Sequence, residues 1–131
     1  MAKKVLYFQH AERIIDAGSE EKRMYIILEG AVEITLSDGE NKIFVALLKK
    51  NDFFGELSLF NNSARTANAT AKGDVKLTYI ESYEQLKSFL MKNPAFAAKM
   101  VQDLTKRLTK TNELLMGKVS EVNRLKLTRQ L

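Results

Sequence analysis

FGELSLFNNSARTANA, residues 54–69, combines apolar residues typical of a core with one glycine, one acidic and one basic residue. Gly55 has no Cβ, so a ligand can approach the backbone closely there. Residues 56–60 can form one helical turn, whose unpaired N–H groups and dipole favour an anion. Arg65, nine positions after Glu56, supplies a forked cation suited to phosphate. The stretch therefore predicts an anion-binding loop between strands.

Glu56 conflicts with a site for an isolated anion, because like charges repel. The conflict disappears if the carboxylate accepts a hydrogen bond from a hydroxyl while Arg65 neutralises a phosphate. A nucleoside 3′,5′-cyclic monophosphate offers both groups, since its ribose 2′-OH is free. The alternative is a structural ion pair between Glu56 and Arg65 in a fold that binds no ligand.

The sequence around this stretch has the residue pattern of short antiparallel strands. Its apolar runs are rich in β-branched and aromatic residues and are separated by turn signals. Ser37-Asp38-Gly39-Glu40 predicts a hairpin turn, and Lys72-Gly73 predicts a second break. The expected strands are 24–29, 31–36, 42–48, 66–71 and 74–80. This pattern predicts a mainly β fold with helices, an antiparallel β-roll or jelly roll flanked by helices.

From Ser82 onward the apolar period is that of helices. Ser82 can act as the N-cap of a short helix in a capping box, with Gln85 reaching back to it. Asn93 and Pro94 then start a second helix, because asparagine caps well and proline is tolerated at the first helical position. We expect two parts: a ligand-binding β-roll with short helices over 1–94, and a long C-terminal helix over 95–131.

The long helix has an apolar seam and carries the whole charge excess. Residues 1–94 contain 13 basic and 13 acidic side chains, whereas 95–131 contain 8 and 3, which gives the net +5. Six of nine heptad a and d positions are apolar, which favours a homodimer through this helix. A basic helix can also attract nucleic acid, although a solvated face is the simpler interpretation. The a and d positions are Val101, Leu104, Leu108, Thr111, Leu115, Lys118, Val122, Leu125 and Arg129.

The composition excludes several function classes. The sequence has no cysteine and only one histidine, His10, so thiolate or His-rich metal sites and Ser-His or Cys-His nucleophile pairs are not available. A cupin-like metal enzyme on a similar barrel lacks its histidine ligands. No window of about 18 apolar residues exists, and the apolar run near the start is too short for a signal peptide. We expect a cytoplasmic protein that is not an enzyme, without metal, cofactor or membrane contact.

Two motifs resemble the cyclic-nucleotide-binding domain. FGELSL at 54–59, with Arg65-Thr66-Ala67 after it, is similar to that family's phosphate-binding cassette, and YIILEGAVE at 25–33 resembles its hairpin. One departure is Ala64, where many members have proline. The resemblance implies a β-roll flanked by helices that binds cAMP or cGMP. It places Glu56 on the ribose 2′-OH and Arg65 on the cyclic phosphate, with Gly55 and the N–H groups of Leu57 and Ser58 assisting.

Base selection is assigned to other residues by the same resemblance. A hydroxyl at Thr66 can reach a phosphate oxygen or the 2-amino group of a syn guanine, so it permits cGMP without excluding cAMP. Residues 106–113 resemble the dimer helix of cyclic-AMP receptor proteins, in which polar residues at the places of Thr111 and Asn112 contact adenine. For Thr66 the alternative is a β-branched residue that starts a strand. For Thr111 the alternative is a polar residue that sets the register of a coiled coil. We expect cAMP to be favoured, with cGMP possible.

The expected function is therefore a cyclic-nucleotide sensor that transmits binding through its C-terminal helix. The chain ends at Leu131 without a helix-turn-helix segment, so we expect either the sensor part of a longer regulator or a separate sensor that addresses another protein. The alternative function is a nucleic-acid-binding regulator acting through the basic helix.

Overall fold

The computed structural model describes the backbone of residues 4–38, 40–60 and 65–130, and the side chains of 4–37, 40–60 and 65–117. Contacts divide the chain into two compact units, Met1–Phe89 and Leu90–Leu131. The first unit contains the β-sheet, and the second contains the long helix. Gly39 of the predicted hairpin turn and Ala64 before the arginine lie outside the described residues.

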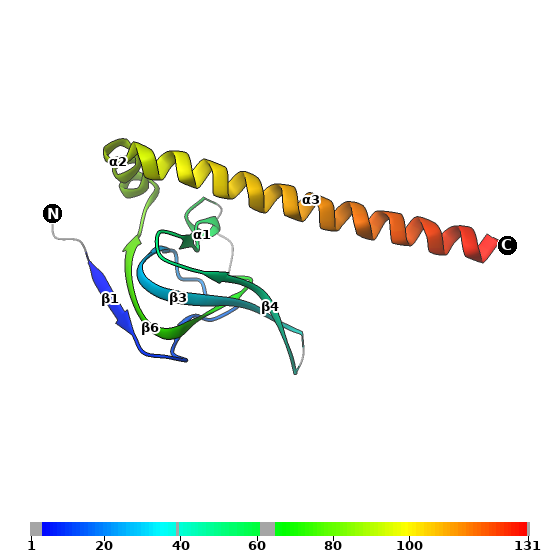
Figure 1. Ribbon diagram of the computed structural model, residues 1–131, viewed down its shortest axis with the longest axis horizontal. Helices are drawn as coiled ribbons and strands as arrows, with labels where there is room; N and C mark the ends of the chain where they lie inside the picture. Colours follow the sequence, from blue (N-terminus) through cyan, green and yellow to red (C-terminus); the bar gives the residue numbers. More distant parts are fainter. Residues whose placement is uncertain (1–3, 39, 61–64, 131) are drawn as a thin grey trace. The chain divides into compact units, whose positions relative to one another are not determined.

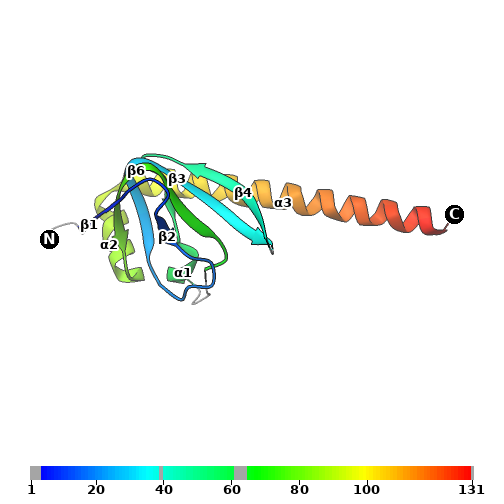
Figure 2. The ribbon, with the colours of Figure 1, turned by 90° about the horizontal axis from the view of Figure 1, so that it is seen from below.

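Two long antiparallel strands, β3 (Met24–Asp38) and β6 (Asn68–Ile80), form the centre of the sheet (Figure 1). The sheet order is β1-β6-β3-β4, and every strand pair within the described residues is antiparallel (Figure 2). The short β2 pairs with β6, and β5 pairs with β3. This arrangement confirms the predicted antiparallel fold class. The other strands are β1 (Val5–Phe8), β2 (Arg13–Ile15), β4 (Asn41–Leu48) and β5 (Phe53–Phe54).

Both long strands continue through a glycine bend. The sequence predicted an interruption in each, at Gly30 and at Gly73, and this prediction was wrong. Both glycines have positive φ, +91° and +77°, and the register of β3 against β6 shifts at this point. A Cβ on Gly30 would lie 2.3 Å from the carbonyl oxygen of Asp74. The two strands therefore bend together as a bulge instead of ending.

The bulge also changes which residues of β3 face the core. Before Gly30 the core cluster contains Tyr25 and Ile27, whereas after it the cluster contains Val32 with Ile34 packed against it. Side chains alternate across a strand, so one extra residue shifts the buried set by one position. Both halves of β3 consequently contribute to one hydrophobic core.

The short helices begin where their capping residues predict. Helix α1 (Leu57–Phe60) is the turn expected after Gly55, and α2 (Tyr83–Lys92) follows Ser82. The Ser82 hydroxyl accepts a hydrogen bond from the Gln85 N–H at 3.2 Å. The Gln85 side chain, however, accepts from the N–H of Glu81 at 2.9 Å, one residue before the expected donor. The capping box is therefore present, but the Gln85 side chain accepts from the N–H of Glu81 instead of the N–H of Ser82.

Helix α3 (Pro94–Gln130) confirms the long C-terminal helix. Three residues of the predicted seam, Val101, Leu108 and Leu115, are exposed at 65%, 62% and 58%. Side chains from Lys118 onward lie outside the described residues. Within the parts of the chain that the structure describes, none of the helices combines the length and apolar character that a membrane crossing needs.

Candidate functional site

Gly55 lies at the sharp turn between β5 and α1. Its φ is +84°, and a Cβ there would lie 2.6 Å from the Arg65 Nη1 atom and 2.6 Å from the carbonyl oxygen of Arg23. The sequence predicts another role for this glycine, the close approach of a ligand to the backbone. The structure shows that the absent side chain makes room for the arginine itself.

Arg65 is buried at the centre of the site, with 7% of its surface exposed. Its Nη1 donates to the Gly55 carbonyl at 2.8 Å, and its Nη2 donates to the Arg23 carbonyl. Its Nε is buried and has no hydrogen-bond partner among the residues that the structure describes. Burial lowers the pKa of the Arg65 guanidinium, and the carboxylates of Glu21 and Glu56 partly oppose this change. Among the described residues, the hydrogen-bond acceptors of this desolvated guanidinium are two neutral carbonyls, which favours an incoming anion.

The main chain of Arg65 is held by the loop before β3. The Arg65 N–H donates to the Ser19 carbonyl at 2.8 Å, and the Gly18 N–H donates to the Arg65 carbonyl at 2.6 Å. Together with the Arg23 carbonyl, this loop fixes both the backbone and the side chain of the arginine. These partners were not predicted from the sequence, because any residue type supplies a backbone carbonyl. The one sequence feature that pointed to this loop was the glycine at position 18, which is typical of a turn. In the structure its φ is +88°.

Glu56 and the helical turn after it precede Arg65 in the chain, and the Glu56 carboxylate acts electrostatically on the arginine. Glu56 is buried, with 8% exposed, and Ser58 is also buried. Within the described residues, the Leu57 N–H has no protein acceptor among the backbone bonds of this turn, whereas the Ser58 N–H donates to the Gly55 carbonyl at 3.3 Å. Of the two N–H groups expected to assist, Leu57 is thus available in this structure and Ser58 is weakly engaged.

The remaining residues of the predicted site lie in two places. Thr66 directly follows Arg65 and is exposed. Thr111 and Asn112 are exposed on α3, in the second unit, where the Thr111 hydroxyl donates to the Arg107 carbonyl at 2.9 Å. The structure therefore brings together Gly55, Glu56, Leu57, Ser58 and Arg65, while the base-selecting roles of Thr66, Thr111 and Asn112 stay predictions.

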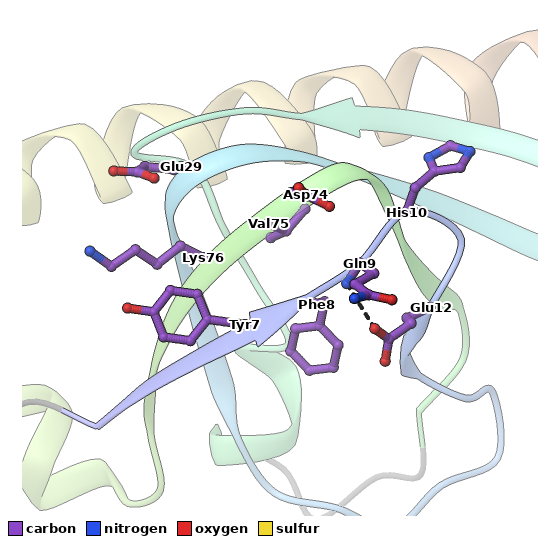
Figure 3. A pocket seen from close by; sticks show the side chains of 9 residues that line it. All are labelled: Tyr7, Phe8, Gln9, His10, Glu12, Glu29, Asp74, Val75 and Lys76. Carbon is purple, nitrogen blue, oxygen red and sulfur yellow. Dashed lines mark hydrogen bonds between the residues drawn. The ribbon is translucent and has the colours of Figure 1, made fainter.

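A separate surface hollow of about 670 Å³ lies beside β1 (Figure 3). None of its lining residues belongs to the stretch from Gly55 to Thr66. It contains the carboxylates of Glu12, Glu29 and Asp74, which disfavour an anionic ligand. Among the described residues, no group of three His, Cys, Asp or Glu side chains is arranged to hold a metal ion.

The profile of the cyclic nucleotide-binding domain matches residues 5–93, which contain the buried arginine and its neighbouring turn. The chain belongs to the cyclic nucleotide-binding domain family. The predicted resemblance is confirmed, and the matched range contains the predicted cassette from Gly55 to Thr66.

Relatives of the domain include regulators and one enzyme. A CRP-like cAMP-activated global transcriptional regulator of Mycobacterium tuberculosis is 29% identical over 110 residues, covering 82% of this chain and 48% of the relative. The chain thus spans about half the length of that relative. The catabolite activator protein of Thermus thermophilus has the same fold, with a TM-score of 0.73 at 24% identity over 86% of this chain and 53% of that one. The EAL enzyme Bd1971 in its cGMP-bound form has a TM-score of 0.61 at 26% identity over 80% of this chain and 28% of that one.

Proposed function

We propose that this cyclic nucleotide-binding domain is a non-enzymatic sensor that takes a 3′,5′-cyclic nucleotide between Gly55 and Thr66, with cAMP favoured. The observation that carries the proposal is the buried Arg65 guanidinium. Within the described parts of the chain it donates to two neutral carbonyls, and its Nε has no partner. A cyclic phosphate supplies the countercharge and an acceptor that this group lacks.

Arg65 and Glu56 bind different groups of the ligand. Arg65 takes the phosphate, and Glu56 accepts a hydrogen bond from the ribose 2′-OH. The Leu57 N–H adds a donor to a phosphate oxygen, and the Ser58 N–H joins it if its long bond to the Gly55 carbonyl opens. A buried carboxylate beside the arginine fits this division better than it fits binding of inorganic phosphate.

Two of the compared proteins bear on the choice of base. The relative named as cAMP-activated supports cAMP, while the neighbour with bound cGMP keeps that nucleotide as the alternative. An exposed hydroxyl at Thr66 is compatible with either base. We assign contacts with the base to Thr66, Thr111 and Asn112.

The signal leaves the domain through α3. Its exposed residues Leu108 and Leu115 support dimer formation with a second copy of this helix. Thr111 lies between them on the expected seam, so dimer contacts and base contacts would meet there. A coupling free energy of about 1 to 3 kcal/mol is typical of such linkage, and it would act on a downstream protein or effector domain.

Titration calorimetry with cAMP, cGMP and linear 5′-AMP tests the ligand class. We expect both cyclic nucleotides to bind and 5′-AMP to bind much more weakly. Arg65→Ala should weaken cAMP binding by about 2 to 5 kcal/mol, roughly 30- to 5,000-fold in Kd. The control is Arg13→Ala, which removes an exposed arginine paired with Asp16 at 3.4 Å and should leave Kd unchanged. Equal affinity of wild type and Arg65→Ala would contradict the proposal.

Nucleic-acid binding is the second candidate, because Lys106 and Lys110 are exposed on the basic helix. Binding of duplex DNA that weakens steeply with added salt would support it. Absence of binding at low salt would remove it. The sensor proposal does not depend on this result.

A further inference from the structure

Tyr25 connects the two carbonyl groups that hold the Arg65 side chain. Only 2% of Tyr25 is exposed. Its ring stacks on Phe54 with centroids 5.2 Å apart and planes inclined by 19°. Phe54 directly precedes Gly55, whose carbonyl accepts from Arg65 Nη1. The ring face of Tyr25 therefore supports one of the two carbonyls.

The hydroxyl end of Tyr25 supports the other carbonyl. This hydroxyl donates a hydrogen bond to Glu21 Oε1, in the loop that precedes β3. The Glu21 carboxylate also lies 3.8 Å from the Arg23 Nε. Arg23 supplies the carbonyl that accepts from Arg65 Nη2. The hydrogen bond between the Tyr25 and Glu21 side chains thus joins the two ends of segment 21–25, which contains the Arg23 carbonyl.

The Arg23 side chain is held on its other face as well. Its guanidinium carbon lies 4.4 Å from the centroid of the Tyr79 ring, within cation–π distance. Tyr79 in turn contacts Tyr25, with centroids 6.4 Å apart. The segment from Glu21 to Arg23 is therefore restrained by aromatic contacts and by a charge-assisted hydrogen bond, and the direction of the Arg23 carbonyl follows from them.

We propose that Tyr25 is a positioning residue for nucleotide binding, which orients the Arg65 guanidinium through its hydrogen bond to Glu21 and its stacking on Phe54. The inference rests on the proposed function and deepens it, because it names the residues that set the affinity of the same site. A guanidinium that binds phosphate must be aimed before the ligand arrives, since each misplaced donor loses affinity. Tyr25 and Glu21 touch the arginine's partners and are not placed on the nucleotide.

The Tyr25 hydroxyl keeps the proton that it donates to Glu21. Burial first, and the hydrogen bond to Glu21 second, raise the pKa of Tyr25 to about 12. The phenol therefore stays protonated across the neutral pH range. The bond to an acceptor carboxylate is charge-assisted and is among the stronger side-chain hydrogen bonds.

The test compares single and double variants by cAMP calorimetry. Tyr25→Phe keeps the stacked ring and removes only the hydroxyl, and Glu21→Gln keeps an acceptor but removes the charge. We expect Tyr25→Phe to raise Kd about 10-fold, the factor that equals about 1.4 kcal/mol. Glu21→Gln should raise Kd less, and Tyr25→Phe should add nothing in a Glu21→Ala background. The matched control is Tyr7→Phe, which removes the hydroxyl of a tyrosine that is 74% exposed and should leave Kd unchanged.

An Arg65→Lys background separates positioning from general stability. Lysine has no fork to aim, so Tyr25→Phe should change Kd less than about twofold there. The same 10-fold loss in that background, or no loss in wild type, would overturn the inference while leaving the proposed function intact. If Tyr25→Phe does not fold, the exposed Glu21→Ala variant takes its place, with a several-fold loss expected in wild type and none in Arg65→Lys. Failure of the wild-type domain to bind any cyclic nucleotide would instead overturn the proposed function and the inference with it.

Discussion

Replacing Gly55 by alanine should damage both stability and ligand binding, because two independent costs meet at this position. The φ of +84° costs an alanine about 1 to 2 kcal/mol. The new Cβ would also lie 2.6 Å from the Arg23 carbonyl oxygen and 2.6 Å from Arg65 Nη1. Relieving such overpacking adds about 1 to 3 kcal/mol. The total is a loss of about 2 to 5 kcal/mol in the free energy of unfolding, and Arg65 must move.

Urea denaturation and cAMP calorimetry on the same samples measure both effects. Gly73→Ala is the matched control, since its φ is +77° and nothing lies within 4 Å of the added Cβ. It should cost about 1 to 2 kcal/mol from backbone conformation alone and leave the affinity for cAMP unchanged. Gly55→Ala should be less stable than Gly73→Ala by about 1 to 3 kcal/mol and should bind cAMP more weakly. Equal stability and equal affinity of the two variants would refute the packing argument.

Three further predictions address the fold, the tyrosine and the helix. Asn68→Ala removes a buried amide that accepts from a loop N–H at 2.7 Å and donates to a β3 serine at 3.2 Å; urea denaturation should show a loss of about 1 to 3 kcal/mol, and an unchanged midpoint would contradict it. The folded-state pKa of Tyr25, about 12, lies above the ordinary value of 10, so its stabilising contribution is complete below pH 10 and is lost as pH rises toward 12. Thermal melts should show this fall in the wild type and a shallower one in Tyr25→Phe, and identical slopes would count against the assignment. Leu108→Glu and Leu115→Glu should weaken self-association in sedimentation experiments, whereas Leu114→Glu, equally exposed but off the seam, should have a smaller effect; equal effects of all three would exclude a defined seam.

The sequence was sufficient to predict the family and the fold class, while the ligand roles of Glu56 and Arg65 stay predictions. Glu56 and Arg65 pose an apparent charge conflict that a cyclic nucleotide would resolve, and both follow the glycine turn at Gly55, which points to one loop. The antiparallel strands follow from alternation, and the long helix follows from Asn93 and Pro94. Local chemistry of side chains was enough for these features.

Contacts made by the backbone were not predictable in the same way. The carbonyls of Ser19 and Arg23 hold the arginine, yet any residue type supplies a carbonyl. The continuity of β3 through Gly30 was also missed, because glycine permits both a turn and a bulge, and only pairing with β6 selects the bulge. The return bond of Gln85 to Glu81 depends on backbone direction at the helix start.

The central claim is that Arg65 binds the phosphate and Glu56 binds the ribose 2′-OH of one cyclic nucleotide. A comparison of cAMP with 2′-deoxy-cAMP tests it most directly. In the wild-type domain the deoxy ligand should bind about 10-fold more weakly, the loss expected for one hydrogen bond to a charged acceptor. In Glu56→Ala both ligands should bind equally, with the arginine still retaining the phosphate. A Glu56→Ala domain that still prefers cAMP over 2′-deoxy-cAMP by the wild-type factor would contradict the account.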